Sequence, residues 1–230
     1  MRIGILQTGH APEPLLPENG TYPDMFKTLL GGHGFDFQNW DVEGMEFPEG
    51  VHDADGWLIT GSRHGAYEDH PFIPPLEAFI RDAYAAHVPM VGICFGHQIL
   101  AQALGGRVEK FAGGWSVGKQ TYCINGTQMR VNAWHQDQVV SVPAGAQVLG
   151  GNDFCQYAAL AYGDRALSFQ PHPEFSTAMT HGLARTRGVG LVPQAQLDTV
   201  LADPSPAEDA AKVGQMIAEF FLKPREATHV

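Results

Sequence analysis

Residues 88–106 read VPMVGICFGHQILAQALGG, and this stretch decides the fold. Its first six residues, 88–93, form a continuous apolar run that predicts a buried strand. From residue 95 onwards apolar side chains recur at a spacing of about 3.6 residues, which predicts a helix that Gly105 and Gly106 end. A strand that passes directly into a helix is the unit from which parallel sheets are built. The stretch therefore predicts an α/β protein.

The same alternation of strands and helices appears nearer the start of the chain. Apolar runs at 2–7 and 56–60 predict two more buried strands, and an extended pattern at 35–40 predicts another. Helical spacing at 22–30 and 74–87 predicts the helices that connect these strands. Strands and helices in this order predict a mainly parallel sheet with helices on both faces.

The second half of the chain has a different pattern. Between 107 and 170 the sequence shows short strand signals at 118–124, 128–133, 146–150, 154–162 and 166–170. They predict a short antiparallel strand region. After it, residues 176–224 read as helices, so we expect 176–230 to be a helical C-terminal extension of one domain that spans 1–230.

Composition excludes some classes of partner. The chain has 14 Lys and Arg residues against 25 Asp and Glu, a formal charge of −11. This charge repels phosphate backbones and anionic membrane surfaces, so neither nucleic acid nor a membrane is an expected partner. The three cysteines, Cys94, Cys123 and Cys155, form no CxxC pair, and their odd number disfavours a disulfide framework. We expect a reducing, cytoplasmic location.

Cys94 stands at the carboxyl end of a predicted strand, where α/β sheets bind their ligands. The sequence G-I-C-F-G at 92–96 resembles a nucleophile elbow with a thiol in place of the hydroxyl. At the start of the following helix, free backbone N–H groups favour the thiolate. A free cysteine is more often a small buried apolar residue, but the glycines on both sides argue against mere packing. We therefore expect Cys94 to be a nucleophile.

A second strand end carries a candidate base. The apolar run ALSF ends in Gln170-Pro171-His172-Pro173-Glu174. In an extended segment the side chains of His172 and Glu174 point the same way, so the carboxylate can fix the tautomer of the imidazole while the ring addresses Cys94. We expect His172 to be the base and Glu174 to orient it.

The turn after the strand at 56–60 is a candidate oxyanion hole. Gly61 offers a backbone N–H without an obstructing Cβ, next to the N–H of Phe95. Ser62 is a candidate contact to the substrate, although a hydroxyl in a turn often only caps its own backbone.

Several motifs together resemble a known family. They are GICFGHQILAQALGG at 92–106, ITGS at 59–62, WHQD at 134–137 and QPHPEF at 170–175. This set is similar to the class I, triad-type glutamine amidotransferases over roughly residues 1–175. The resemblance implies a three-layer, flavodoxin-like fold and an enzyme that cleaves the γ-amide of glutamine through a γ-glutamyl thioester, with release of ammonia.

The resemblance also implies roles for particular residues. Cys94, His172 and Glu174 would form the catalytic triad, and Gln98 and the segment His135–Asp137 would help to hold the glutamyl substrate. Cys94 would attack the γ-carbonyl, and His172 would protonate the leaving amine and then activate water. This chemistry requires no metal or organic cofactor.

Two alternatives to a glutamine amidotransferase remain open. Phe95, the HQD sequence at 135–137 and the chain length also resemble the γ-glutamyl peptidase branch, which cleaves γ-glutamyl bonds in glutathione-like compounds or γ-glutamyl amines. That activity needs a roomier pocket, whose rim we expect at 8–21 and 62–74. The second alternative is a catalytically silent, regulatory binding subunit, which the intact triad motifs disfavour.

No synthetase domain accompanies the motifs in the 230 residues. We therefore expect ammonia to pass to a separate synthetase subunit or to be released. Cys123 and Cys155 lack the flanking glycines of an elbow and are expected to be structural. Six histidines outside the motifs are expected to lie too far apart to form a metal site; they are His10, His33, His64, His70, His87 and His181.

Overall fold

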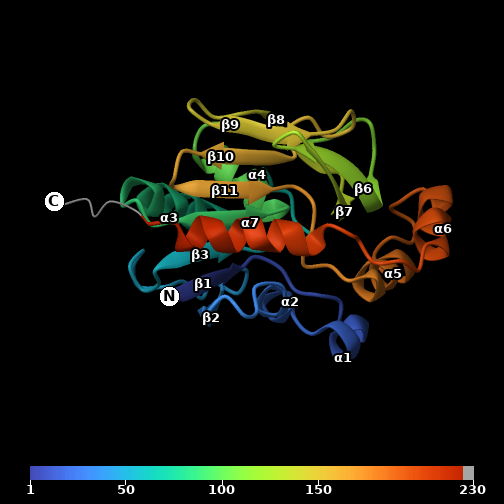
Figure 1. The fold of residues 1–230 in the computed structure, drawn as a ribbon, viewed down its shortest axis with the longest axis horizontal. Helices are drawn as coiled ribbons and strands as arrows, with labels where there is room; N and C mark the ends of the chain where they lie inside the picture. Colours follow the sequence, from blue (N-terminus) through green and yellow to red (C-terminus); the bar gives the residue numbers. More distant parts are fainter. Residues whose placement is uncertain (225–230) are drawn as a thin grey trace.

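The computed structural model describes residues 1–224. The strands of its main sheet are β1 (Arg2–Gln7), β2 (Asp36–Asp41), β3 (Gly56–Ile59), β4 (Met90–Ile93), β6 (Ser116–Ile124), β7 (Thr127–His135), β9 (Gln147–Gly151), β10 (Ala159–Tyr162) and β11 (Ala166–Phe169). Within the described residues the sheet has nine strands in the order β2-β1-β3-β4-β11-β10-β9-β6-β7 (Figure 1). β5 (Arg107–Lys110) and β8 (Asp137–Ser141) form a separate antiparallel pair.

The sheet has a parallel half and an antiparallel half. β2, β1, β3, β4 and β11 pair in parallel, and β10, β9, β6 and β7 continue the sheet with antiparallel pairs. The predicted antiparallel region is therefore an extension of the same sheet. The carboxyl ends of the parallel strands meet at one edge, where loops from β1, β3, β4 and β11 lie side by side.

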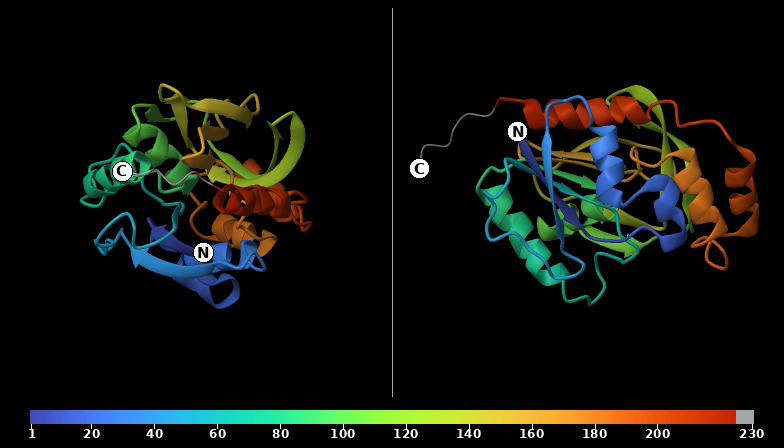
Figure 2. Two further views of the ribbon diagram at one scale, coloured as in Figure 1. Left: turned by 60° about the vertical axis from the view of Figure 1, so that its left-hand side comes forward. Right: turned by 90° about the horizontal axis from the view of Figure 1, so that it is seen from below.

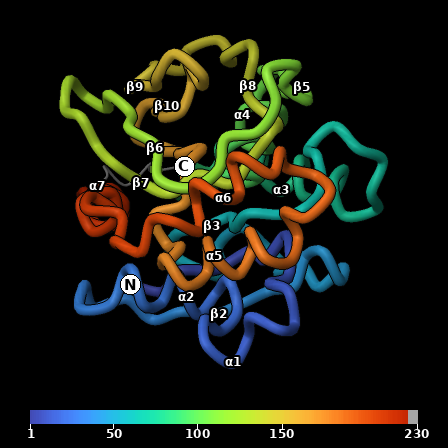
Figure 3. Tube along the Cα trace, turned by 90° about the vertical axis from the view of Figure 1, so that its right-hand side faces the viewer, coloured from blue at the N-terminus to red at the C-terminus, as the bar shows by residue number. Residues whose placement is uncertain are grey.

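Helices cover both faces of the parallel half, as the alternation of sequence patterns predicts. The helices are α1 (Leu16–Asn19), α2 (Tyr22–Leu29), α3 (Ile73–Ala85), α4 (Phe95–Ala103), α5 (Thr177–Arg185), α6 (Gln194–Ala202) and α7 (Ala210–Leu222), with a 3-10 turn at Glu13–Leu15. α7 lies along one face and α3 along the opposite face (Figure 2). α5 and α6 lie beyond the carboxyl ends of the strands, in front of the sheet in Figure 3.

Two buried apolar clusters hold these layers together. Because side chains of a strand alternate between faces, Ile59 joins a cluster with α3 and α4, whereas its neighbour Leu58 joins a cluster with α2 and α7. From α7, Val213, Ile217 and Phe221 are buried in the second cluster. This arrangement confirms the predicted three-layer α/β fold.

Some short elements differ from the sequence prediction. β5 and β8 carry no strand signal that separates them from loops, and the Pro-rich segment before α2, in which no helical spacing is apparent, contains the 3-10 turn and α1. Both misses concern segments of five residues or fewer, in which periodicity has too few positions to register. Among residues 1–224, no helix combines the length and the apolar character needed to cross a membrane.

Candidate active site

Cys94 occupies a strained turn between β4 and α4. Its φ of 55° and ψ of −104° lie outside the regions that ordinary residues adopt. A Cβ on Gly92 would overlap the carbonyl oxygen of Gly96, and a Cβ on Gly96 would overlap the carbonyl oxygen of Ile59. Only glycines therefore allow α4 to start so close to the strands. The backbone N–H of Cys94 donates to the carbonyl of Phe169 at 2.8 Å, which ties the turn to β11.

His172 is held next to Cys94 by contacts on several sides. Its Nδ1 lies 2.6 Å from Oε1 of Glu174, and both side chains are buried. Because a carboxylate only accepts hydrogen bonds, Nδ1 is the donor. Its backbone N–H donates to the carbonyl of Asn132 at 2.7 Å. The Phe175 ring stacks on the imidazole, with centroids 3.9 Å apart and planes 7° apart. These contacts leave the imidazole little freedom to turn.

The surroundings of His172 favour its charged form. Burial, the largest single contribution, lowers its pKa. The charges of Glu174 and Cys94 and hydrogen bonds to both side chains act in the opposite direction and raise the pKa above its ordinary value. The buried group of three therefore suits an imidazolium between a carboxylate and a sulfur atom.

The turn after β3 lies against this group. A Cβ on Gly61 would stand 2.9 Å from Cε1 of His172 and 3.7 Å from Cβ of Cys94. Phe95 is the first residue of α4 and directly follows Cys94, and its side chain is fully buried. Ser62 Oγ accepts a hydrogen bond from the backbone N–H of His64 at 3.1 Å, as a hydroxyl that caps its own turn does.

Gln98, His135 and Asp137 also meet at this edge of the sheet. Nε2 of Gln98 donates to the carbonyl of Asp137 at 2.9 Å and to Oε1 of Gln170 at 3.1 Å, so this amide connects α4 to the β7–β8 turn. Burial lowers the pKa of His135 to about 3, so its ring is neutral. Nδ1 of His135 lies 3.2 Å from the carbonyl of Asp137, and among the described residues its buried Nε2 has no partner.

The carboxyl group of Asp137 is partly desolvated. Burial raises its pKa, and a hydrogen bond with the Tyr67 hydroxyl opposes that change. Burial and the neighbouring Asp137 raise the pKa of Tyr67 to about 12, so the phenol keeps its proton and serves as the donor. Tyr67 lies on the loop between β3 and α3, and we did not identify it from the sequence.

A cavity of about 460 Å³ opens over Cys94. Of the predicted site residues, seven line it: Gly61, Ser62, Cys94, Gln98, His135, Asp137 and His172. Glu174 lies behind His172, and Phe95 contributes to the helix start instead of the lining. A second cavity of about 520 Å³ lies between β6, β7, α5 and α6 and contains none of the predicted residues. The chemistry-bearing side chains thus gather in the cavity over Cys94.

The lining includes side chains outside the quoted motifs. They are Tyr22, Lys110, Trp115, Leu183, Arg187 and Leu191, besides Arg63, His64, Gly65, Tyr67 and Glu68 on the loop after β3. Trp134 and Phe175, which stand in the WHQD and QPHPEF motifs, line the cavity as well. Of the expected rim at 8–21 and 62–74, six residues line the cavity, namely Ser62, Arg63, His64, Gly65, Tyr67 and Glu68, and no residue of 8–21 or 69–74 does. Arg187 is one of three cations in the lining, with Arg63 and Lys110. Its Nη2 donates to the carbonyl of His10 at 2.6 Å, and its Nη1 donates to the Tyr22 hydroxyl at 3.3 Å.

The other cysteines differ from Cys94. All three are free thiols, Cys123 is exposed, and burial raises the pKa of Cys155 to about 12. Neither has a comparable histidine contact among the interactions of the described residues. The expectation that they are structural stays a prediction.

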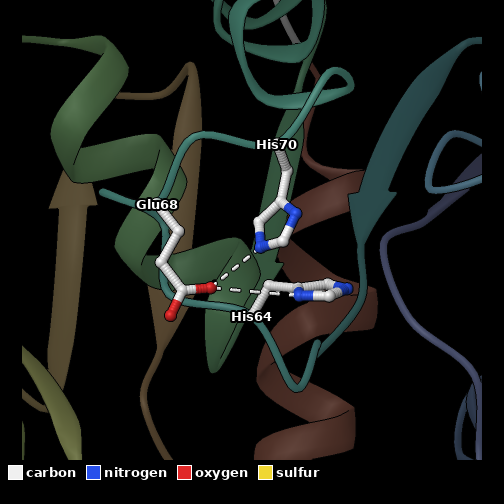
Figure 4. A group of neighbouring side chains, drawn as sticks. All are labelled: His64, Glu68 and His70. Atoms are coloured by element: carbon white, nitrogen blue, oxygen red, sulfur yellow. Dashed lines mark hydrogen bonds and ion pairs between the residues drawn. The ribbon is translucent and has the colours of Figure 1, made fainter.

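The expectation that the histidines outside the motifs are scattered is wrong for two of them. His64 and His70 lie with their ring centroids 4.0 Å apart, and Glu68 reaches both (Figure 4). These three side chains form the group within residues 1–224 whose ligand atoms could hold a metal ion. These side chains meet because the loop between β3 and α3 folds back on itself. Their spacing in the sequence matches no known metal-binding motif, so the sequence alone does not reveal this proximity.

Comparisons of the sequence and of the fold with known proteins point to the same family. The model for "Glutamine amidotransferase class-I" matches residues 38–185. A glutamine amidotransferase-like protein of Schizosaccharomyces pombe is 30% identical, covering 96% of this chain and 98% of the relative. Gamma-glutamyl peptidase 4 of Arabidopsis thaliana is 28% identical, covering 89% and 88%. A solved glutamine amido transferase from Methylobacillus flagellatus shares the fold, with a TM-score of 0.74, 22% identity and coverage of 100% and 98%.

Proposed function

Since the chain belongs to the class-I glutamine amidotransferase family, we propose that it hydrolyses γ-glutamyl amide bonds with Cys94 as nucleophile, and that glutamine is its substrate. The observation that carries this proposal is the position of His172, which lies beside Cys94 in one cavity and whose Nδ1 is hydrogen-bonded to Glu174. A nucleophile whose base is oriented by a third group is the arrangement that covalent catalysis requires.

The first half of the reaction forms a thioester. Sγ of Cys94, as the thiolate, attacks the γ-carbonyl carbon, and the carbonyl oxygen becomes an oxyanion. The backbone N–H groups of Gly61 and Phe95 are the proposed donors to that oxyanion. Collapse of the intermediate breaks the C–N bond, and His172 gives its proton to the leaving nitrogen. Ammonia leaves when the substrate is glutamine, and an amine leaves when it is a γ-glutamyl peptide.

The second half releases glutamate. His172, now neutral, takes a proton from a water molecule, whose oxygen attacks the thioester carbon. The C–S bond breaks, and the sulfur leaves as the thiolate beside the imidazolium that has just formed. Glu174 keeps the Nδ1 proton directed towards itself in both halves, so that Nε2 always exchanges the proton.

Side chains around the cavity suit the rest of a glutamyl group. Asp137 supplies a carboxyl group, and the neutral His135 offers an acceptor nitrogen without a protein partner. Both fit an ammonium group, which donates hydrogen bonds and carries a positive charge. Gln98 supports them by holding the Asp137 carbonyl.

A γ-glutamyl peptidase activity is the second candidate. Relatives named gamma-glutamyl peptidase cover most of this chain. The cavity of about 460 Å³ falls in the range of roughly 300–1,000 Å³ that holds drug-sized ligands, which exceeds what glutamine needs. Arg187 lines it, and a guanidinium binds carboxylates such as the one that ends a peptide leaving group.

Release of glutamate from three substrates distinguishes the candidates. The wild-type protein is given glutamine, glutathione and a γ-glutamyl amine, with Cys94→Ala as the inactive variant and Cys123→Ala as the matched control. We expect glutamine turnover by the wild type and the control and none by Cys94→Ala. A strong preference for glutathione would replace the first candidate with the second.

The same assay tests the alternative of a catalytically silent subunit and the expectation that a separate synthetase subunit accepts the ammonia. Wild-type protein that is inactive on all three substrates would overturn the enzymatic proposal. Ammonia released without any added protein would agree with simple hydrolysis. Glutamine turnover that rises on addition of a synthetase would support transfer to a separate subunit.

A further inference from the structure

Two loops bring histidines and carboxylates together at the mouth of the Cys94 cavity. His64, Glu68 and His70 lie on the loop between β3 and α3, and Glu43 lies on the turn that follows β2. His64 and Glu68 line the cavity. The reaction proposed above uses none of these side chains.

The ligand atoms of three of these residues converge. Oε2 of Glu68 lies 2.9 Å from Nε2 of His70 and 3.9 Å from Nδ1 of His64. All three atoms are within 4.8 Å of one another, and Figure 4 shows both rings turned towards the same carboxylate oxygen. Bonds of 2.0–2.2 Å to a shared ion require nearly this separation between ligand atoms, so small side-chain rotations suffice.

Glu43 fixes the tautomer that His64 needs. Its Oε1 lies 2.9 Å from Nε2 of His64, and its Oε2 lies 2.8 Å from Nδ1 of His10. A carboxylate only accepts, so Nε2 of a neutral His64 carries the proton and Nδ1 carries the free electron pair. A carboxylate on the far nitrogen is the usual support of a metal-binding histidine, and it orients the ring and makes it a stronger ligand.

Hydrogen bonding explains only part of the cluster. The Glu68–His70 pair is satisfied by a proton on Nε2 of His70. Nδ1 of His64, however, points its electron pair at a carboxylate oxygen 3.9 Å away, and the side chain of His64 is only 16% exposed. Two electron-rich atoms that face each other at this distance suit a cation between them. When the ion binds, His70 keeps its second nitrogen protonated and coordinates through Nε2.

We propose that His64, Glu68 and His70 form a binding site for a divalent transition-metal ion of the zinc class, with Glu43 as its supporting carboxylate. Two imidazoles and one carboxylate favour zinc and similar ions, whereas calcium and magnesium prefer sites built from oxygen atoms. Three protein ligands leave at least one coordination position open. The site lies at the rim of the cavity and requires no change in the roles of Cys94 and His172.

Zinc binding to the full chain tests the site. The background is Cys94→Ala, because a thiolate binds zinc by itself. Isothermal titration with Zn²⁺ is expected to give one ion per chain, with magnesium and calcium not competing. His64→Ala, His70→Ala and Glu68→Gln are each expected to weaken binding by at least about tenfold, and Glu43→Gln by about 10- to 100-fold. His52→Ala, at an exposed histidine outside the cluster, is the matched control and is expected to bind zinc normally.

Cobalt gives a second readout that does not depend on affinity. Co²⁺ bound to Cys94→Ala is expected to show visible ligand-field bands without a thiolate charge-transfer band, and His70→Ala is expected to lose them. The proposal is overturned if Cys94→Ala binds no zinc, or if both histidine variants bind it like His52→Ala while their melting temperatures show that they are folded. Because these measurements use an inactive variant, their result is separate from that of the proposed function.

Discussion

At the scale of single residues, the backbone of Cys94 supports its assignment as a nucleophile. A non-glycine residue at φ 55° and ψ −104° costs roughly 1–3 kcal/mol and persists only where its surroundings enforce it. Here Gly92 and Gly96 permit the turn, and the carbonyl of Phe169 holds the Cys94 N–H. A residue that only filled core space would gain nothing from this conformation.

Replacing Glu174 by Gln tests the orientation of His172. The NH2 group of the new amide can donate to Nδ1 of His172, where the wild-type carboxylate only accepts, and so favour the wrong tautomer. We predict a fall in kcat of about 10²- to 10⁴-fold with a cooperative unfolding transition retained. Kinetics and thermal melts check this, with Glu18→Gln as the exposed control. An unchanged kcat would remove Glu174 from the proposed triad.

Gly61→Ala tests the turn that faces the same imidazole. The added methyl group would lie 2.9 Å from Cε1 of His172, so the ring must shift from its position beside Cys94. We predict at least about a tenfold loss of kcat/KM, because misplacement by a fraction of an ångström weakens proton transfer. Gly50→Ala is the matched control, since a methyl group there meets no atom within 4 Å. Equal activity of the two variants would contradict the role of Gly61.

At the scale of elements, β7 supports the loop that carries His172. Asn132 of β7 forms an isolated bridge with His172, and its Nδ2 donates to the carbonyl of Phe175 at 2.8 Å. An antiparallel strand beyond the parallel half of the sheet thereby fixes a loop that follows β11. The strand itself was predicted from the sequence, but a contact between residues 40 positions apart leaves no trace in periodicity.

Asn132→Ala tests this connection. The substitution leaves the buried carbonyl of Phe175 without its donor, which costs about 1–3 kcal/mol. We predict that the free energy of unfolding falls by that amount and that kcat falls with it, as measured by urea unfolding and steady-state kinetics. Gln128→Ala, exposed on the same strand, is expected to change neither. If Asn132→Ala behaved like Gln128→Ala, β7 would not be the support of the loop.

Sequence patterns predicted the long elements and where the candidate catalytic residues lie in the fold better than they predicted the side chains around them. The strand and helix around Cys94, and the spacing of His172 and Glu174, follow from local periodicity and loop chemistry. Arg187, Tyr67 and His64 reach the cavity through loops, and His70 meets His64 on the same loop; loop geometry depends on tertiary contacts. Their types and spacings match no motif with a fixed mechanism, so only the fold reveals them.

At the scale of the whole molecule, buried neutral histidines make stability depend on pH. Burial lowers the pKa of His97 and of His135 to about 3, whereas both titrate near 6.5 in an unfolded chain. Below pH 6.5 the unfolded chain therefore binds more protons than the folded one, and stability falls as pH falls. The raised pKa of His172 affects stability mainly at higher pH. Its contribution to the free energy of unfolding is complete below pH 6.5 and is lost as the pH rises through the raised pKa.

We predict a loss of about 2 kcal/mol of unfolding free energy per buried histidine between pH 6.5 and pH 5, at about 1.4 kcal/mol per pH unit. Urea unfolding at pH 5, 6 and 7 measures it. His97→Gln is expected to halve the slope of stability against pH, whatever its effect on stability at pH 7. His52→Gln is expected to keep the wild-type slope, and equal slopes for the two variants would contradict the assignment.

The organisation of the complete chain is still to be tested. A single domain over 1–230 and a cytoplasmic location stay predictions, and the expected helical extension 176–230 is described only to residue 224, so its last six residues lie outside the described residues. Within 176–224, α7 packs on the sheet and α5 and α6 enclose the carboxyl edge. The C-terminal segment thus contributes Leu183 and Arg187 to the cavity and belongs to the site as much as the motifs do.

The central claim is a covalent γ-glutamyl intermediate on Cys94, and acid-quenched mass spectrometry during turnover tests it most directly. We predict a γ-glutamyl adduct on the peptide that contains Cys94, removed by hydroxylamine as a thioester is, present in Cys123→Ala and absent from Cys94→Ala together with all turnover. Turnover that survives in Cys94→Ala, or an adduct on another residue, would contradict the claim.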